Sequence, residues 1–147
     1  MGQKTNPTGF RVGIMENWRS RWIADKKNFG RLLIEDHKIR KHVQDGYASA
    51  GIPKVEIERL GDEAKVIIHA ARPGLLIGRK GARVDKLRED LEALVKHKVN
   101  LEVKEIQTPE LSSKVVAEAV ADQLKRRQSF RRVLKNAIRA TRDAGAL

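Results

Sequence analysis

The sequence has 147 residues, with 31 Lys and Arg against 19 Asp and Glu and a formal net charge of +12. This length suits one domain with an additional arm and allows the chain to bury roughly two-thirds of its unfolded surface. The absence of cysteine excludes disulfides and cysteine-based zinc sites and fits a reducing compartment. Because the first residues lack an apolar signal core and no window approaches a membrane span, we expect a cytosolic protein without a membrane partner.

The positive charge is concentrated at the two ends of the chain. From Lys125 to Arg142 there are eight basic residues and no acidic one. Solubility alone favours mixed signs, so this segment indicates a polyanionic partner. A basic helix is also typical of membrane surfaces, but the accompanying Val, Ala, Leu and Ile suit core packing better than insertion.

Residues 1–25 contain scattered glycine and proline and no sustained periodicity, which predicts an extended basic arm. Within it, Trp18 and Trp22 flank Arg19 and Arg21. These side chains could contact RNA by stacking and phosphate pairing. Alternatively, the two indoles anchor the arm on the domain, and the sequence leaves both interpretations open.

A helical region and a β-hairpin are predicted next. Apolar residues at helical spacing predict one or two helices over 28–50, interrupted by the polar residues 36–38 and ending near Gly46 or Gly51. Alternation over 55–58 and 64–70, with Gly61-Asp62 between the two runs, predicts two antiparallel strands.

Two further helices and a strand complete the middle of the chain. Pro73 suits the first turn of a short helix that extends through Ile77. After Gly81, an apolar stripe predicts an amphipathic helix, formed by Val84, Leu87, Leu91, Leu94 and Val95. Alternation over 99–104 predicts a third strand.

The C-terminal part is predicted to form a pair of helices. Thr108-Pro109-Glu110 predicts a helix start, with Thr108 as N-cap and Pro109 in the first turn, and Ser129 predicts the cap of a second helix. The residues expected to face inward are Val115, Val116, Ala119, Val120 and Leu124, followed by Phe130, Val133, Leu134, Ala137 and Ile138. Arg131, Lys135, Arg139 and Arg142 then share the opposite face of the last helix.

The stretch Gly78-Arg79-Lys80-Gly81 interrupts an apolar run between two predicted helices. Glycines let another backbone come close, and the N–H groups of the helix that begins near Ala82 favour an anion. Arg79 and Lys80 add positive charge. The stretch therefore suits a sugar-phosphate backbone, with the aliphatic residues on either side holding the loop in the core.

Other kinds of site lack support in the sequence. Nothing matches GxxxxGK(S/T) or GxGxxG, so ATP hydrolysis and dinucleotide binding lose their main support. The four histidines show no metal-ligand spacing, and no catalytic constellation is visible. We therefore expect no enzyme, no cofactor, no metal and no small-molecule substrate.

VIIHAARPGLLIGRKGARVDKLREDL resembles the type II KH domain, an RNA-binding fold whose GXXG loop clamps the nucleic-acid backbone. Three stretches together, MGQKTNPTGFRVGI, ARPGLLIGRKG and LKRRQSFRRVLKNAIRA, resemble the ribosomal protein three family of the bacterial small subunit. The resemblance implies an α+β fold with a basic arm and helix at 1–37, a KH type II domain at 38–106 and a basic helical pair at 107–147. It also implies a structural role in the head of the small ribosomal subunit.

Several partners follow from this resemblance. The loop and arm are expected to face 16S ribosomal RNA, and the residues matching Arg131, Arg132 and Lys135 are expected to face messenger RNA at the entry channel. Neighbouring head proteins are further expected partners. The alternative is a free KH protein that binds single-stranded RNA outside the ribosome. The candidate RNA-binding residues are Lys4, Arg11, Arg19, Arg21, Gly78, Arg79, Lys80, Gly81, Arg126, Arg127, Arg131, Arg132, Lys135 and Arg139.

One departure from the family concerns length. The family carries a second α/β domain after the KH domain, and this sequence ends at Leu147, about where that domain would begin. We therefore expect a fragment or a shortened form, and contacts made by the second domain are not carried over.

Overall fold

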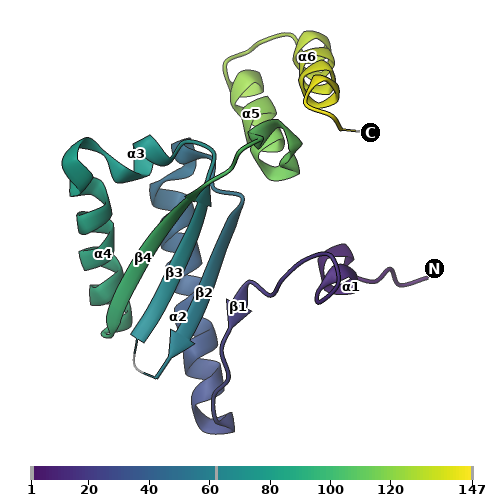
Figure 1. Ribbon diagram of the computed structural model, residues 1–147. Coiled ribbons are helices and arrows are strands. Elements are labelled where there is room, and N and C mark those ends of the chain that lie inside the picture. The colour runs from purple at the N-terminus through teal and green to yellow at the C-terminus, as the bar shows by residue number, and fades with distance from the viewer. Residues whose placement is uncertain (1, 62, 147) are drawn as a thin grey trace.

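The computed structural model describes residues 2–61 and 63–146, apart from the side chain of Lys80. Asp62, predicted to lie in the hairpin turn, is outside the described residues. Figure 1 shows the arrangement of the elements. In chain order they are α1 (Pro7–Arg11), β1 (Ser20–Arg21), α2 (Lys26–Gly46), η1 (Ala48–Ala50), β2 (Lys54–Leu60), β3 (Glu63–Ala70), α3 (Pro73–Ile77), η2 (Arg79–Gly81), α4 (Ala82–Val95), β4 (Lys98–Glu105), η3 (Pro109–Leu111), α5 (Ser113–Lys125) and α6 (Phe130–Asp143), where η marks 3-10 turns.

The strands form one mixed sheet in the order β1-β2-β3-β4. β2 and β3 are antiparallel, with Ile57 opposite Val66, and β4 lies parallel to β3, with Leu101 opposite Val66. A parallel neighbour needs a crossover connection, and α3 and α4 supply it. The predicted hairpin, third strand, short helix and amphipathic helix are confirmed, and so is the α+β type II KH fold.

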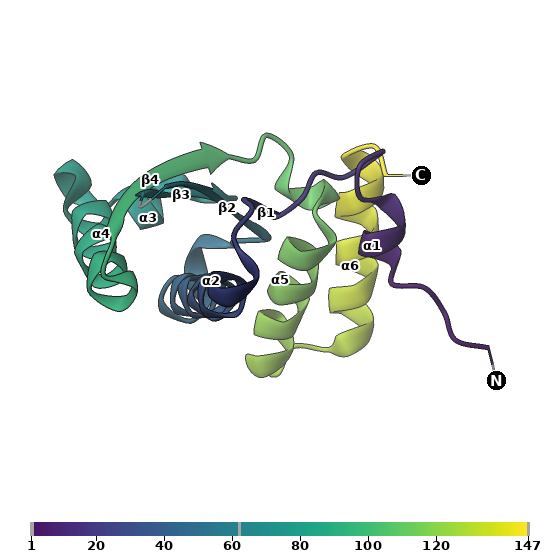
Figure 2. The same ribbon diagram turned by 90° about the horizontal axis from the view of Figure 1, so that it is seen from below.

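Helices α2 and α4 cover one face of the sheet (Figure 2). Alternate residues of the strands point into this layer, and β-branched residues at these positions pack well on a pleated surface. Burying each such side chain contributes roughly 1.5–3 kcal/mol. The buried core comprises Ile39, Val43, Ala50, Ile52, Val55, Ile57, Val66, Ile68, Ala70, Leu76, Leu87, Leu91, Val95 and Val99.

The arm is less extended than predicted. Residues Pro7–Arg11 form the short helix α1, because Asn6 Oδ1 accepts hydrogen bonds from the backbone N–H groups of Thr8 and Gly9 at 2.9 and 3.1 Å. Proline at the first helical position is favourable. Further along, Ser20 and Arg21 pair with β2 as the unpredicted strand β1. The arm therefore joins the sheet.

Of the one or two helices predicted over 28–50, the structure has one, and the polar residues 36–38 do not interrupt it. The helix is continuous from Lys26 to Gly46, and Asp36 lies in its buried face together with Ile39 and Val43. A buried carboxylate is tolerated only when it is paired and hydrogen-bonded. The side chains that satisfy Asp36 come from β1, β2 and the arm.

The C-terminal helices differ from the prediction at two points. Thr108 precedes a 3-10 turn, η3, and the α-helix begins at Ser113. Several residues expected to face inward are exposed by 42–60% of their surface, namely Leu124, Phe130, Leu134 and Ile138. The physical reason is that α5 and α6 lie beyond the end of the sheet (Figure 1). Within the described part of α6, Val133 alone is buried. Leu94 of α4, also predicted on the apolar stripe, is 44% exposed.

Candidate nucleic-acid interface

The GRKG loop connects α3 to α4 through two glycines with positive φ. Gly78 has φ 70° and ψ −171°, and Gly81 has φ 83° and ψ −3°. The conformation of Gly78 is essentially restricted to glycine. A Cβ there would lie 2.8 Å from Arg83 Cγ, so Gly78 is required both for its backbone angles and for space.

Arg83, which sequence reasoning missed, holds this loop together. Its Nη1 donates a hydrogen bond to the carbonyl oxygen of Leu75 at 3.0 Å, while its stem covers Gly78. The flanking aliphatics contribute less than predicted: Leu76 is fully buried, whereas Leu75 and Ile77 are 39% and 42% exposed. One buried leucine and one arginine therefore fix the loop.

The charged side of the loop faces outward. Arg79 is exposed, and the side chain of Lys80 lies outside the described part of the chain. Directly after Gly81, α4 runs for 14 residues from Ala82. Its first N–H groups have no partner within the helix, which gives the loop a partial positive charge in addition to that of its side chains.

The four basic residues predicted in the arm have different surroundings. Lys4 and Arg19 are exposed, and Arg11 Nη1 donates to the carbonyl oxygen of Pro7 at 2.9 Å. Arg21 contacts the carboxylates of Glu56 and Glu58 on β2. The charge of Arg21 is therefore already compensated within the protein.

The two tryptophans also differ. Trp22 donates its Nε1–H to Asp36 Oδ2 at 2.8 Å, and its ring lies 5.2 Å from that of Phe29. Trp18 is 65% exposed. Trp22 thus anchors the arm, and Trp18 remains available for stacking.

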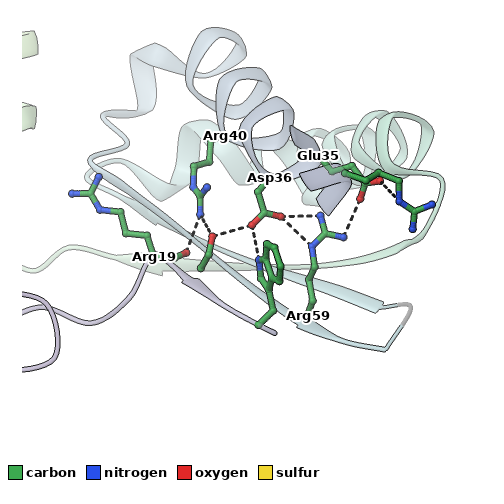
Figure 3. Close-up of polar contacts among 8 residues, drawn as sticks. Arg19, Glu35, Asp36, Arg40 and Arg59 are labelled. Atoms are coloured by element: carbon green, nitrogen blue, oxygen red, sulfur yellow. Dashed lines mark hydrogen bonds and ion pairs between the residues drawn. The ribbon is translucent and has the colours of Figure 1, made fainter. Parts of the chain in front are cut away.

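Asp36 is the centre of a polar network that joins the arm, α2 and β2 (Figure 3). Its two oxygens accept hydrogen bonds from Ser20 Oγ and Trp22 Nε1, at 2.9 and 2.8 Å, and from Arg59 Nε and Nη2, at 3.0 and 2.8 Å. The burial of Asp36 could have been predicted from its position in the sequence. It lies three residues before Ile39 and seven before Val43, on the apolar stripe of α2.

The C-terminal candidates lie on a separate surface. Arg126 and Arg127 lie in the turn before α6, where Arg127 has a positive φ of 58°. The Arg131 guanidinium lies 5.8 Å from the ring centroid of Phe130, within cation–π range. The structure leaves all the predicted residues of this surface exposed: Arg126, Arg127, Arg131, Arg132, Lys135 and Arg139. In Figure 1 the loop between α3 and α4 and helix α6 are at opposite ends of the molecule.

The described residues also bear on metal binding and membrane crossing. Across residues 2–61 and 63–146, no group of three or more His, Asp or Glu side chains is placed to hold a metal ion. None of the described helices combines the length and apolar character that a membrane crossing requires. His42 Nε2 lies 3.9 Å from Asp90 Oδ2, a contact between α2 and α4 at the surface.

Comparison with known proteins gives consistent results. The KH domain family matches residues 38–111. Proteins named small ribosomal subunit protein uS3 from Persephonella marina, Caldicellulosiruptor saccharolyticus and Rhodopirellula baltica are 51%, 48% and 47% identical to this chain. Each alignment covers 99% of this chain, and 65%, 66% and 64% of the respective relative. The chain therefore spans slightly less than two thirds of the length of these curated relatives.

Proposed function

Because this chain belongs to the KH domain family and, within it, to the family of small ribosomal subunit protein uS3, we propose that it is a non-enzymatic, RNA-binding constituent of the small ribosomal subunit. The observation that carries the proposal is the GRKG loop. Two glycines with positive φ and an exposed Arg79 precede the N-terminus of a 14-residue helix. This arrangement suits a ribose-phosphate backbone, which KH domains clamp with a GXXG loop.

The partners of the separate surfaces are part of the same proposal. The loop and the arm contact 16S ribosomal RNA in the head of the subunit, in the cytoplasm, next to other head proteins. The exposed cations of α6, above all Arg131, Arg132 and Lys135, contact messenger RNA at the entry channel. Their exposure and the absence of acidic residues from 125 to 142 support this assignment. The domain limits 1–37, 38–106 and 107–147 are proposed with it.

The test measures binding of fluorescently labelled fragments of small-subunit ribosomal RNA by fluorescence anisotropy at several salt concentrations. Replacing Arg79 and Lys80 by Asp is expected to abolish binding, because the loop then repels phosphate. The melting temperature stays nearly unchanged, because Arg79 is exposed. Lys38→Asp with Lys41→Asp on α2 is the matched control: the charge change is the same, the sites are also exposed, and we expect a smaller loss of affinity.

A second variant addresses α6. Neutralising Arg131, Arg132 and Lys135 with Ala is expected to reduce the slope of log affinity against log salt by about 0.7 for each lost phosphate contact on single strands. An unchanged slope would mean that α6 faces protein or solvent. Equal losses from the loop variant and its α2 control would contradict the assignment of the loop.

A further inference from the structure

The Asp36 network contains more arginine than carboxylate, and the carboxylates are already occupied. Arg59 donates two hydrogen bonds to Asp36 Oδ1 and a third, from Nη1, to Glu35 Oε2 at 3.1 Å. Arg31 Nε lies 3.8 Å from Glu35 Oε1. The negative charge of the network therefore faces Arg59 and Arg31.

Arg40 reaches the same network but has uncharged partners. Its Nη2 donates to the carbonyl oxygen of Arg19 at 3.1 Å and to Ser20 Oγ at 2.5 Å (Figure 3). Within residues 2–61 and 63–146, neither Arg19 nor Arg40 forms an ion pair, whereas Arg31 and Arg59 both do. The arm and α2 thus meet where Arg40 contacts the Arg19 carbonyl oxygen, and neither of these two arginines is ion-paired among the described residues.

The surroundings of Arg40 make this arrangement costly without a further partner. Burial is the main cause that lowers the pKa of Arg40 from its ordinary value; the charge of Arg19 acts in the same direction, and Asp36 opposes both. The buried Nε of Arg40 also lacks a hydrogen-bond partner among the described residues. Because Arg19 and Arg40 are both positively charged and neither forms an ion pair among the described residues, an anion at this junction would stabilise the folded arm.

We propose that Arg19 and Arg40 form a phosphodiester-binding site at the junction of the arm and α2, where the chain contacts RNA. This inference rests on the proposed function and adds a contact to it. Guanidinium groups present a planar fork of donors that matches phosphate oxygens. The Arg19 side chain is exposed and extends away from Asp36, toward solvent (Figure 3).

Asp36 is a positioning residue for this site. By accepting hydrogen bonds from Ser20 and Trp22, it fixes the arm in the place where the Arg19 carbonyl oxygen meets Arg40. Ser20 Oγ links the two halves of the network, since it accepts from Arg40 and donates to Asp36. The site therefore forms only when the arm is docked.

The experiment uses the same labelled ribosomal RNA fragments and follows log affinity against log salt. Arg19→Ala and Arg40→Gln are each expected to reduce the slope by about 0.7, and the double variant by about 1.4. Arg40→Lys keeps the charge and is expected to restore the slope, with weaker binding because the fork is lost. Arg31→Ala, in the same network but paired with Glu35, is the matched control and should leave the slope unchanged.

The possible outcomes separate this site from the function on which it rests. The exposed side chain of Arg19 is not needed for folding, so an unchanged slope in Arg19→Ala would contradict the proposed phosphodiester site. An unchanged slope is also the result expected if the junction binds an acidic protein segment. The loop variant would still test RNA binding separately. If Arg31→Ala reduces the slope as much as Arg19→Ala does, the effect comes from general positive charge, and the proposed phosphodiester site is contradicted. A parent chain that binds no RNA overturns both proposals.

Discussion

Gly78 and Gly74 lie four residues apart and have opposite requirements. Gly78 combines φ 70° with ψ −171°, and a Cβ there would meet Arg83. Gly74 lies inside α3, with open space where its Cβ would be. A side chain is therefore excluded at the first position and accommodated at the second.

We expect Gly78→Ala to lower the free energy of unfolding by about 1–3 kcal/mol, the usual cost of a non-glycine residue in such a conformation. Gly74→Ala should leave it unchanged or raise it by up to about 1 kcal/mol, because alanine is favoured over glycine in helices. Urea unfolding followed by tryptophan fluorescence measures both values. Similar values for the two variants would contradict the described loop conformation.

The residues of the loop were predictable to different degrees. The turn at Gly78 and Gly81 could be predicted because the two glycines lie between a short helix that starts with proline and an amphipathic helix, after a hairpin and before a strand. Arg83 could not, since its role depends on a contact with the carbonyl oxygen of Leu75 that the sequence does not encode locally. The network that satisfies Asp36 within one continuous helix could not be predicted, because its partners come from segments as far as 23 residues away.

At the scale of elements, the open face of the sheet carries opposite charges on neighbouring strands. Glu56 of β2 lies 2.6 Å from Lys54 Nζ, 3.0 Å from Arg21 Nη2 and 3.5 Å from His69 Nε2. Burial acts to raise the pKa of Glu56, but the hydrogen bond from Lys54 and the surrounding positive charges outweigh it, and the pKa lies below its ordinary value of 4.5.

This shift predicts a pH dependence of stability. A carboxyl group whose pKa is lower in the folded state stabilises the fold above its unfolded pKa, and the contribution is lost as the pH falls through the folded pKa. We therefore expect the parent chain to lose stability below about pH 4.5. Glu56→Gln should be less stable at pH 7 and show a shallower acid decline in urea unfolding.

The matched control for this experiment is Glu89→Gln on the exposed side of α4. Its acid profile should follow that of the parent chain. An acid decline in Glu56→Gln as steep as that of the parent would show that the ion pairs around Glu56 do not contribute to stability.

Elements of the KH domain could be predicted better than the helices that follow it. The hairpin, α3 and α4 carry local signals: alternation, an initial proline and a regular apolar stripe. In α6 the same kind of stripe predicted burial, yet Phe130 is 60% and Ile138 is 59% exposed. Periodicity shows which face of a helix is apolar, but whether another element covers that face depends on the tertiary arrangement.

At the scale of the whole molecule, the excess of basic residues behind the net charge of +12 lies in distinct regions. The GRKG loop and α6 lie at opposite ends (Figure 1), while the open face of the sheet between them is occupied by internal ion pairs. The fold class and the loop were predictable because their signals are contiguous in the sequence. The junction of Arg19 and Arg40 was not, because the arm joins α2 only in the folded chain.

Sedimentation of the tagged 147-residue chain in cell lysate, with ribosomal particles separated in the presence of magnesium, tests the central claim most directly. The proposed function predicts that the chain migrates with the small subunit and stays there at moderate salt. A chain that remains at the top of the gradient, yet still binds RNA in isolation, would contradict the claim that these 147 residues join the small subunit; it would indicate either a fragment that needs the family's second domain or a KH protein that acts outside the ribosome.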